Sequence, residues 1–324
     1  MDRFDGVDST QLDEDFIRGG VHEPSARTRQ AIAEFGTGQS SWRQAAPLQP
    51  AGVPQKASRL PKRPKAPRHA TWSRPSPVFI GLVAVTVALG YLLWTNSAGR
   101  YGTFAFVLAA WMVSLCLHEF GHAAVGLHGG DTSVLDKGYM RLDPRKYQHP
   151  LLSFVFPVVA FALGGIGFPG GAVHIDRSAI RSRHWRSAMS LAGPAFNVAC
   201  ALVCLAPFAL GVVTPRVWMH HLTFFAALAL VAALQLSAAV LNLLPIPGLD
   251  GWGVIEPYVD EQVARDAHKV PQGVMFLGLF LLLSVPAVGR LLWWIPLHVC
   301  AAAGVPRFFI SYGWALVHFW NASS

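Results

Sequence analysis

Residues 109–122 read Ala-Ala-Trp-Met-Val-Ser-Leu-Cys-Leu-His-Glu-Phe-Gly-His, an apolar run that ends in a carboxylate flanked by two histidines. An ionisable group at membrane depth is costly unless it is paired, so Glu119 marks a candidate functional site. Residues four apart share one helix face, so His118 and His122 can bind one zinc ion while Glu119 activates water as a general base. Gly121 leaves room for a neighbouring helix or a substrate.

Two alternatives compete with a metal site here. In a soluble helix the same residues would form an ordinary solvated face, but an uncharged membrane helix offers no such solvation. In a transporter, the two histidines and the glutamate would belong to a buried hydrogen-bond network or a proton relay. A relay predicts ionisable residues spread along a path, whereas here they converge on one site.

The composition of the whole chain is that of a membrane protein. Of its 324 residues, 52% are hydrophobic and only 14% are charged, whereas soluble domains carry about 25% charged residues. Fibrous, disulfide-rich and wholly disordered classes are thereby excluded. No secretory signal peptide is expected, because the first apolar run begins only at Val78. We expect the four cysteines, all in apolar runs, to be buried structural thiols: Cys116, Cys200, Cys204 and Cys300.

The chain divides by composition into three regions. Residues 1–77 open acidic and end in seven Lys and Arg between positions 56 and 74, which predicts a disordered tail on the cytoplasmic side of the membrane. We expect residues 78–306 to form a transmembrane core, and residues 307–324 an aromatic segment at the membrane interface. The net charge of +8 therefore indicates orientation and contact with a lipid bilayer. A nucleic-acid partner is not expected, because no folded basic face is visible.

The long apolar segments of the chain, most of them long enough to cross a membrane as a helix, predict an all-α polytopic membrane protein with about six transmembrane helices. They cover residues 78–95, 103–127, 151–168, 188–213, 217–244, 274–289 and 291–306. Segment 151–168 runs into a glycine-rich stretch and is expected to be re-entrant, between the second and third helices. If it crossed once instead, four arginines in 174–187 would move outside, against the positive-inside rule.

A catalytic zinc keeps three protein ligands, so a third must exist. Asp250 is the only charged residue between Arg216 and Glu256, and two prolines and two glycines nearby unwind the end of a helix. The alternative is an ordinary loop aspartate just outside the membrane. With a re-entrant 151–168, Asp250 lies at the same end as the histidines, whereas a single crossing would leave it about 30 Å away.

With these residues in view, the sequence resembles the site-2 proteases, a family of intramembrane zinc metalloproteases. Three ordered motifs carry the resemblance: His-Glu-Phe-Gly-His at 118–122, Ala-Gly-Pro-Ala-Phe-Asn at 192–197, and Asn-Leu-Leu-Pro-Ile-Pro-Gly-Leu-Asp-Gly at 242–251. Residues 130–150 are similar to the compact bacterial branch, and no PDZ insert lies between the motifs. One departure is Gly248, where the family usually has proline.

The resemblance implies one Zn²⁺ per chain, held by His118, His122 and Asp250, with Glu119 activating water. Asn197 and Asn242 would correspond to the family's asparagines near the substrate, where their amides can donate to an oxyanion. The glycine-rich stretch 164–173 either offers a strand edge to an unwound substrate or is a flexible turn.

The implied protein is therefore an endopeptidase of the cell membrane that cuts within or beside transmembrane segments of membrane proteins, in regulated proteolysis that releases a cytoplasmic regulator. Its active site would lie near the cytoplasmic face. The sequence gives no indication of the oligomeric state. A second hypothesis is a catalytically silent relative that acts as a membrane scaffold; such relatives usually lose one of the four metal-site residues, and all four are present here.

Overall fold

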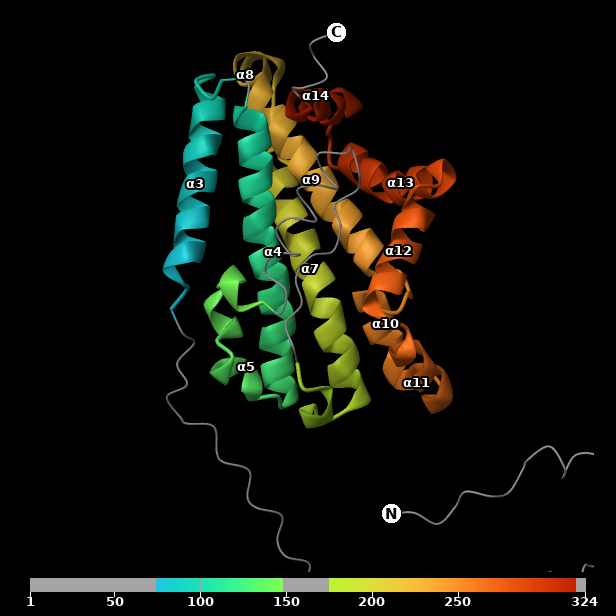
Figure 1. Cartoon of the computed structure of the whole chain (residues 1–324). Helices are drawn as coiled ribbons and strands as arrows, with labels where there is room; N and C mark the ends of the chain where they lie inside the picture. Colours follow the sequence, from blue (N-terminus) through green and yellow to red (C-terminus); the bar gives the residue numbers. More distant parts are fainter. Residues whose placement is uncertain (1–73, 100, 148–174, 319–324) are drawn as a thin grey trace, which may run out of the picture. The chain divides into compact units, whose positions relative to one another are not determined.

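The computed structural model describes residues 74–99, 101–147 and 175–318, all of them in the second of two units, Met1–Lys65 and Ala66–Ser324. Every regular element in these residues is a helix, which confirms the predicted all-α class. Figure 1 shows the arrangement. Nearly all of the predicted tail, the segment 151–168 and the glycine-rich stretch 164–173 lie outside the described residues.

Four of the described helices are long and apolar enough to cross a membrane. They are α3 (Pro77–Trp94), α4 (Gly102–Gly129), α7 (Arg183–Ala209) and α9 (Leu222–Asn242). A fifth span is possible if α12 (Gln272–Leu283) and α13 (Pro286–Ala302), which meet at an angle of 84°, form one broken crossing. The polytopic membrane architecture is confirmed, and the count of six stays a prediction. Pro286 lacks the N–H that would continue α12 into α13.

Shorter helices connect and flank these spans. They are α5 (Ser133–Asp136), α8 (Pro215–His220), α10 (Asp250–Ile255), α11 (Glu261–Lys269) and α14 (Arg307–Val317), with 3₁₀ turns η2 (Tyr139–Arg141), η3 (Pro144–Lys146), η4 (Arg177–Ala179) and η5 (Glu256–Tyr258). All four cysteines are free thiols; two are buried and two are half-buried.

One predicted helix, 217–244, is divided at His221. The backbone there leaves the helical region, with φ −127° and ψ 35°. The His221 ring stacks on Trp94 at 3.5 Å between centroids, and its Nδ1 lies 2.8 Å from the Trp94 carbonyl oxygen. Contacts with the tip of α3 thus accompany the interruption between α8 and α9.

Two backbone hydrogen bonds show which helix ends lie together in the bundle. The Ser76 N–H donates to the Arg141 carbonyl at 2.7 Å, and the Arg181 N–H donates to the Gly129 carbonyl at 2.9 Å. The start of α3, the end of α4 and the start of α7 therefore share one end of the bundle, while Trp94 and His221 mark the other. The chain leaves α4 and enters α7 at the same end, as the re-entrant interpretation requires.

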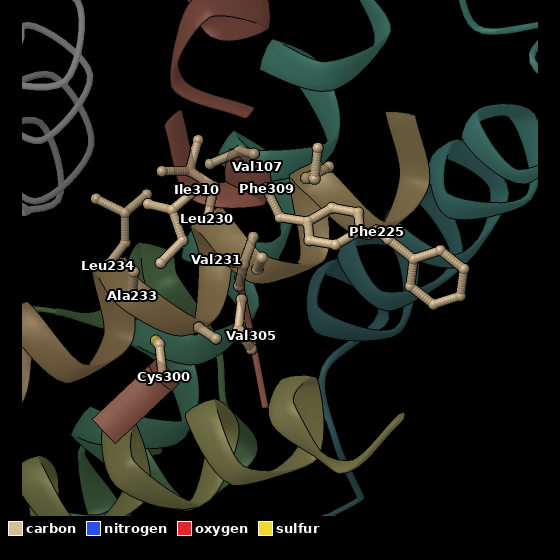
Figure 2. Packing of buried hydrophobic residues seen from close by; sticks show 14 of the residues in the cluster. Val107, Phe225, Leu230, Val231, Ala233, Leu234, Cys300, Val305, Phe309 and Ile310 are labelled. Atoms are coloured by element: carbon tan, nitrogen blue, oxygen red, sulfur yellow. The ribbon is translucent and has the colours of Figure 1, made fainter. Parts of the chain in front are cut away.

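The apolar core is centred on the first half of α9, which packs against α7, α13 and α14. Of the apolar window in α9, 83% is buried, compared with 11% in the peripheral α3. Figure 2 shows Leu230 of α9 next to Ile310 of α14. The described part of the C-terminal segment thus contributes to the core, and its interfacial position stays a prediction.

Candidate metal centre

Three predicted ligands converge below this core, where α4, α7 and α10 meet. His118 and His122 lie one turn apart on α4, with their Nε2 atoms 3.1 Å from each other. Asp250, the first residue of α10, places Oδ2 3.2 Å from the His118 Nε2 and Oδ1 3.2 Å from the His122 Nε2. The structure therefore brings together residues that lie far apart in the sequence.

The residues fit a zinc ion in spacing and in hydrogen bonding. Ligand atoms at about 2.0–2.2 Å from a tetrahedral zinc lie about 3.3–3.5 Å from one another, close to the separations observed. The His122 Nδ1 lies 2.7 Å from the Met189 carbonyl oxygen, and the His118 Nδ1 lies 3.3 Å from the Asn197 Oδ1. With a proton on each Nδ1, both rings donate outward, and each Nε2 lone pair points to the shared centre.

Asp250 lies beyond the end of the span α9, and its carboxyl must be ionised to bind a metal. The turn before it contains Gly248 with φ +93°, a conformation that a proline ring excludes. The departure from the family pattern therefore goes with a different local backbone.

Glycines let the helices approach the histidines closely. A Cβ on Gly193 of α7 would overlap the imidazoles of His118 and His122. A Cβ on Gly121 would lie 2.6 Å from the Phe196 ring and 3.0 Å from the Ala192 carbonyl oxygen. The predicted space at Gly121 thus accommodates the neighbouring helix α7. The role of Gly193 was not predicted from the sequence, because it depends on the register of α7 against α4.

A cavity of about 650 Å³ opens at these ligands. Glu119, which is only 2% exposed, lines it together with Asn197 and Asn242, so all the predicted site residues border one space. The contact of Asn197 with the His118 ring was not indicated by the sequence.

Polar residues far from the motifs line the same cavity on the side of η4 and α11. Arg177 and His268 both line it, and both contact Glu256 of η5: Arg177 forms an ion pair with one carboxylate oxygen, and the His268 Nε2 lies 2.7 Å from the other. Arg177, Glu256 and His268 were not predicted from the sequence, because they belong to separate short helical elements and no motif links them.

A relative from Mycolicibacterium smegmatis, named "Putative zinc metalloprotease Rip2", is 41% identical over 255 residues, which cover 77% of this chain and 95% of the relative. The chain belongs to the site-2 protease family. A Rip2 protein of Mycobacterium tuberculosis is 39% identical over 253 residues, 76% of this chain and 95% of the relative.

A less similar relative, from Bacillus subtilis, is named "Putative zinc metalloprotease YwhC". It is 27% identical over 195 residues, 58% of this chain and 84% of the relative. No protein-family model and no solved structure matches the chain. Family membership and the fit of the three ligand side chains make the protein a zinc metalloprotease with membrane-spanning helices, and Zn²⁺ its metal.

Proposed function

We propose that the protein is an intramembrane endopeptidase that cuts peptide bonds within or beside transmembrane segments of other membrane proteins. His118, His122 and Asp250 hold the zinc, and Glu119 is the general base. The observation that carries this proposal is the position of the cavity, because the histidines and Glu119 belong to the span α4 and are nearly fully buried. A site in this position is suited to a substrate that is itself in the membrane, and not to a soluble one.

The chemistry follows from the groups around the cavity. When bound, zinc supplies Lewis acidity to the scissile carbonyl and to water. Glu119 takes a proton from the attacking water and passes it to the leaving amine. Asn242, at the end of α9, can donate its amide hydrogens to the developing oxyanion. Asn197 holds the His118 ring in the orientation that zinc binding requires.

Charge supports a cytoplasmic active site and a cytoplasmic N-terminus. Eight Lys and Arg of the described residues lie between 130 and 186, at the end of the bundle where α4 ends and α7 begins. Fewer basic residues are described at the other end, where Arg216 belongs to α8 and Arg307 begins α14 beside it. By the positive-inside rule the cavity then faces the cytoplasm, where its polar side admits water. A cut there would release a cytoplasmic regulator.

The deciding experiment measures zinc per purified full-length chain for the wild type and for Asp250→Asn. We expect about one zinc in the wild type and loss of that zinc in the variant, because an uncharged amide is a poor zinc ligand. The matched control is Asp260→Asn, which makes the same change at an exposed position that caps α11 and that asparagine can also cap.

Each outcome of this measurement has a clear meaning. A folded wild type that holds no zinc after metal is resupplied overturns the protease proposal, and the scaffold hypothesis then takes its place. Full zinc occupancy in Asp250→Asn, with unchanged affinity, removes Asp250 from the ligand set. Zinc that is retained by the wild type and the control but lost from Asp250→Asn supports the proposal.

A further inference from the structure

The cavity continues from the metal centre toward the middle of the bundle. On α4, Trp111 and Ser114 line it two turns and one turn before His118; on α9, Gln235 lines it two turns before Asn242. These spacings place the residues on the helix faces that also carry the site. Seven helical residues rise about 10 Å, so the cavity reaches well into the membrane part of the bundle.

A polar pair stands at this depth. Gln235 is 1% exposed, and its Nε2 donates to the Ser114 Oγ at 2.6 Å. The Ser114 hydroxyl in turn donates to the Trp111 carbonyl at 2.9 Å. Within the part of the chain that the structure describes, the Gln235 side-chain oxygen accepts no hydrogen bond, and the buried Trp111 indole N–H finds no acceptor.

Unused hydrogen-bonding capacity is costly in a buried, apolar setting. If the pair served only to join α4 and α9, both the NH₂ group and the oxygen of the Gln235 carboxamide should bond between the helices. Here only the NH₂ group does so, and among the described residues the oxygen of this cavity-lining side chain is left without a donor. A peptide that unwinds for cleavage has the complementary need, since its freed amides have no water at that depth. One carboxamide can both donate to and accept from an amide group.

We infer that Gln235, held in place by Ser114, is a specificity subsite that binds an amide group of the substrate, on the membrane-interior side of the bond that is cut. This inference rests on the proposed function. The amide belongs either to the unwound main chain or to an Asn or Gln side chain of the substrate. Ser114 is a positioning residue, because it acts by orienting the carboxamide.

The test uses full-length protein in liposomes with a panel of single-span test proteins. Their spans are built from Leu and Ala, with one position replaced in turn by Asn or Gln along the segment. The variants are Gln235→Leu, Gln235→Met and Ser114→Ala. Ser237→Ala is the matched control, because the Ser237 hydroxyl donates to the carbonyl three residues earlier at 2.8 Å, as in Ser114, but Ser237 does not line the cavity.

Cleavage rates and cut positions are measured by mass spectrometry, with zinc content and melting temperature as checks on folding. We expect Gln235→Leu to cleave about three- to tenfold more slowly, the loss of about one hydrogen bond, while zinc content is unchanged. Slowing across the whole panel assigns the subsite to the main chain. Slowing confined to segments with Asn or Gln assigns it to a side chain.

Unchanged rates in both Gln235 variants overturn the subsite while leaving the protease proposal intact. An equal loss in Ser237→Ala also overturns it, because the effect would then be one of helix packing. If the zinc-loaded wild type cleaves no member of the panel, the proposed function fails, and the subsite fails with it.

Discussion

The two halves of α9 are similarly buried, but the second half contains strongly polar side chains and the first half does not. Residues 222–234, the apolar half, pack against α14 near Leu230, and Leu230 and Leu234 are at most 1% exposed. Residues 235–242, the polar half, contain Gln235 and Asn242, which are 1% and 5% exposed and line the cavity. One helix therefore forms a close-packed core at one end and the wall of a reactive space at the other.

The difference separates stability from function along a single helix. Close-packed apolar contacts respond to any change in volume. Burying a polar group without a partner costs free energy, so polar groups that line a cavity indicate that a ligand binds there. Changes beside the apolar half should therefore alter the melting temperature, while changes around the cavity should alter zinc binding or cleavage.

The largest effect is expected for Glu119→Gln. Removing a general base lowers the cleavage rate by about 10²- to 10⁴-fold, while zinc content should stay near one per chain because Glu119 is not a ligand. Cleavage of the test proteins in liposomes and metal analysis check both parts. A variant that keeps a substantial share of the parent rate would remove Glu119 from the reaction.

A pair of glycine substitutions contrasts the two regions directly. Gly193→Ala would press a methyl group into both imidazoles, so we expect zinc affinity to fall about 100-fold or more. Gly313→Ala of α14 would press instead on the Ala226 carbonyl of the apolar half, costing about 1–3 kcal/mol of stability with zinc affinity unchanged. Zinc titration and thermal unfolding of both variants measure the two effects. Weaker zinc binding in Gly313→Ala with normal zinc binding in Gly193→Ala would contradict the separation of stability from function.

A smaller effect is expected for Asn197→Ala. Loss of the acceptor on the His118 Nδ1 should weaken zinc binding about 10- to 100-fold, the usual cost of removing such a partner. Asn197→Asp keeps an acceptor at that place and should restore most of the affinity. Asn242→Ala, on the polar half of α9, serves as the control with unchanged zinc affinity. Equal affinity in all three variants would show that His118 needs no partner.

The smallest effect is expected for Arg177→Gln. The Arg177 side chain is 44% exposed, so loss of the ion pair with Glu256 should change the free energy of unfolding by about 1 kcal/mol or less. The change should shrink further in high salt, because ions screen exposed charges. Melting temperatures at low and high salt measure it. A shift worth more than about 2 kcal/mol would mean that this pair holds the structure together.

Much of the site could be predicted from the sequence, because charged residues are rare in the apolar runs and each one stands out. The spacing of His118 and His122 predicted a metal site and the isolation of Asp250 made it a candidate third ligand, but only the resemblance to the site-2 proteases implied all three together. Topology was accessible for the same reason, since the arginines of 174–187 limited the possible paths.

What could not be predicted depends on contacts between distant elements. The interruption at His221 goes with stacking on Trp94, and the closeness of Gly193 to the imidazoles depends on how α7 is placed against α4. The break between α12 and α13 turned two predicted spans into a bent pair. Gln235, by contrast, could have been singled out, as a strongly polar side chain within an apolar helix.

The separation of the ligands along the chain has a consequence for folding. A metal ion bound by His118, His122 and Asp250 is a cross-link that closes a long loop containing all of α7 and α9. Closing a loop of this length restricts the unfolded chain more than it restricts the folded one, and the gain grows with loop length. Zinc would thus fasten α10 to α4, and its removal should loosen the turn that carries Asp250 before the core around Leu230 opens.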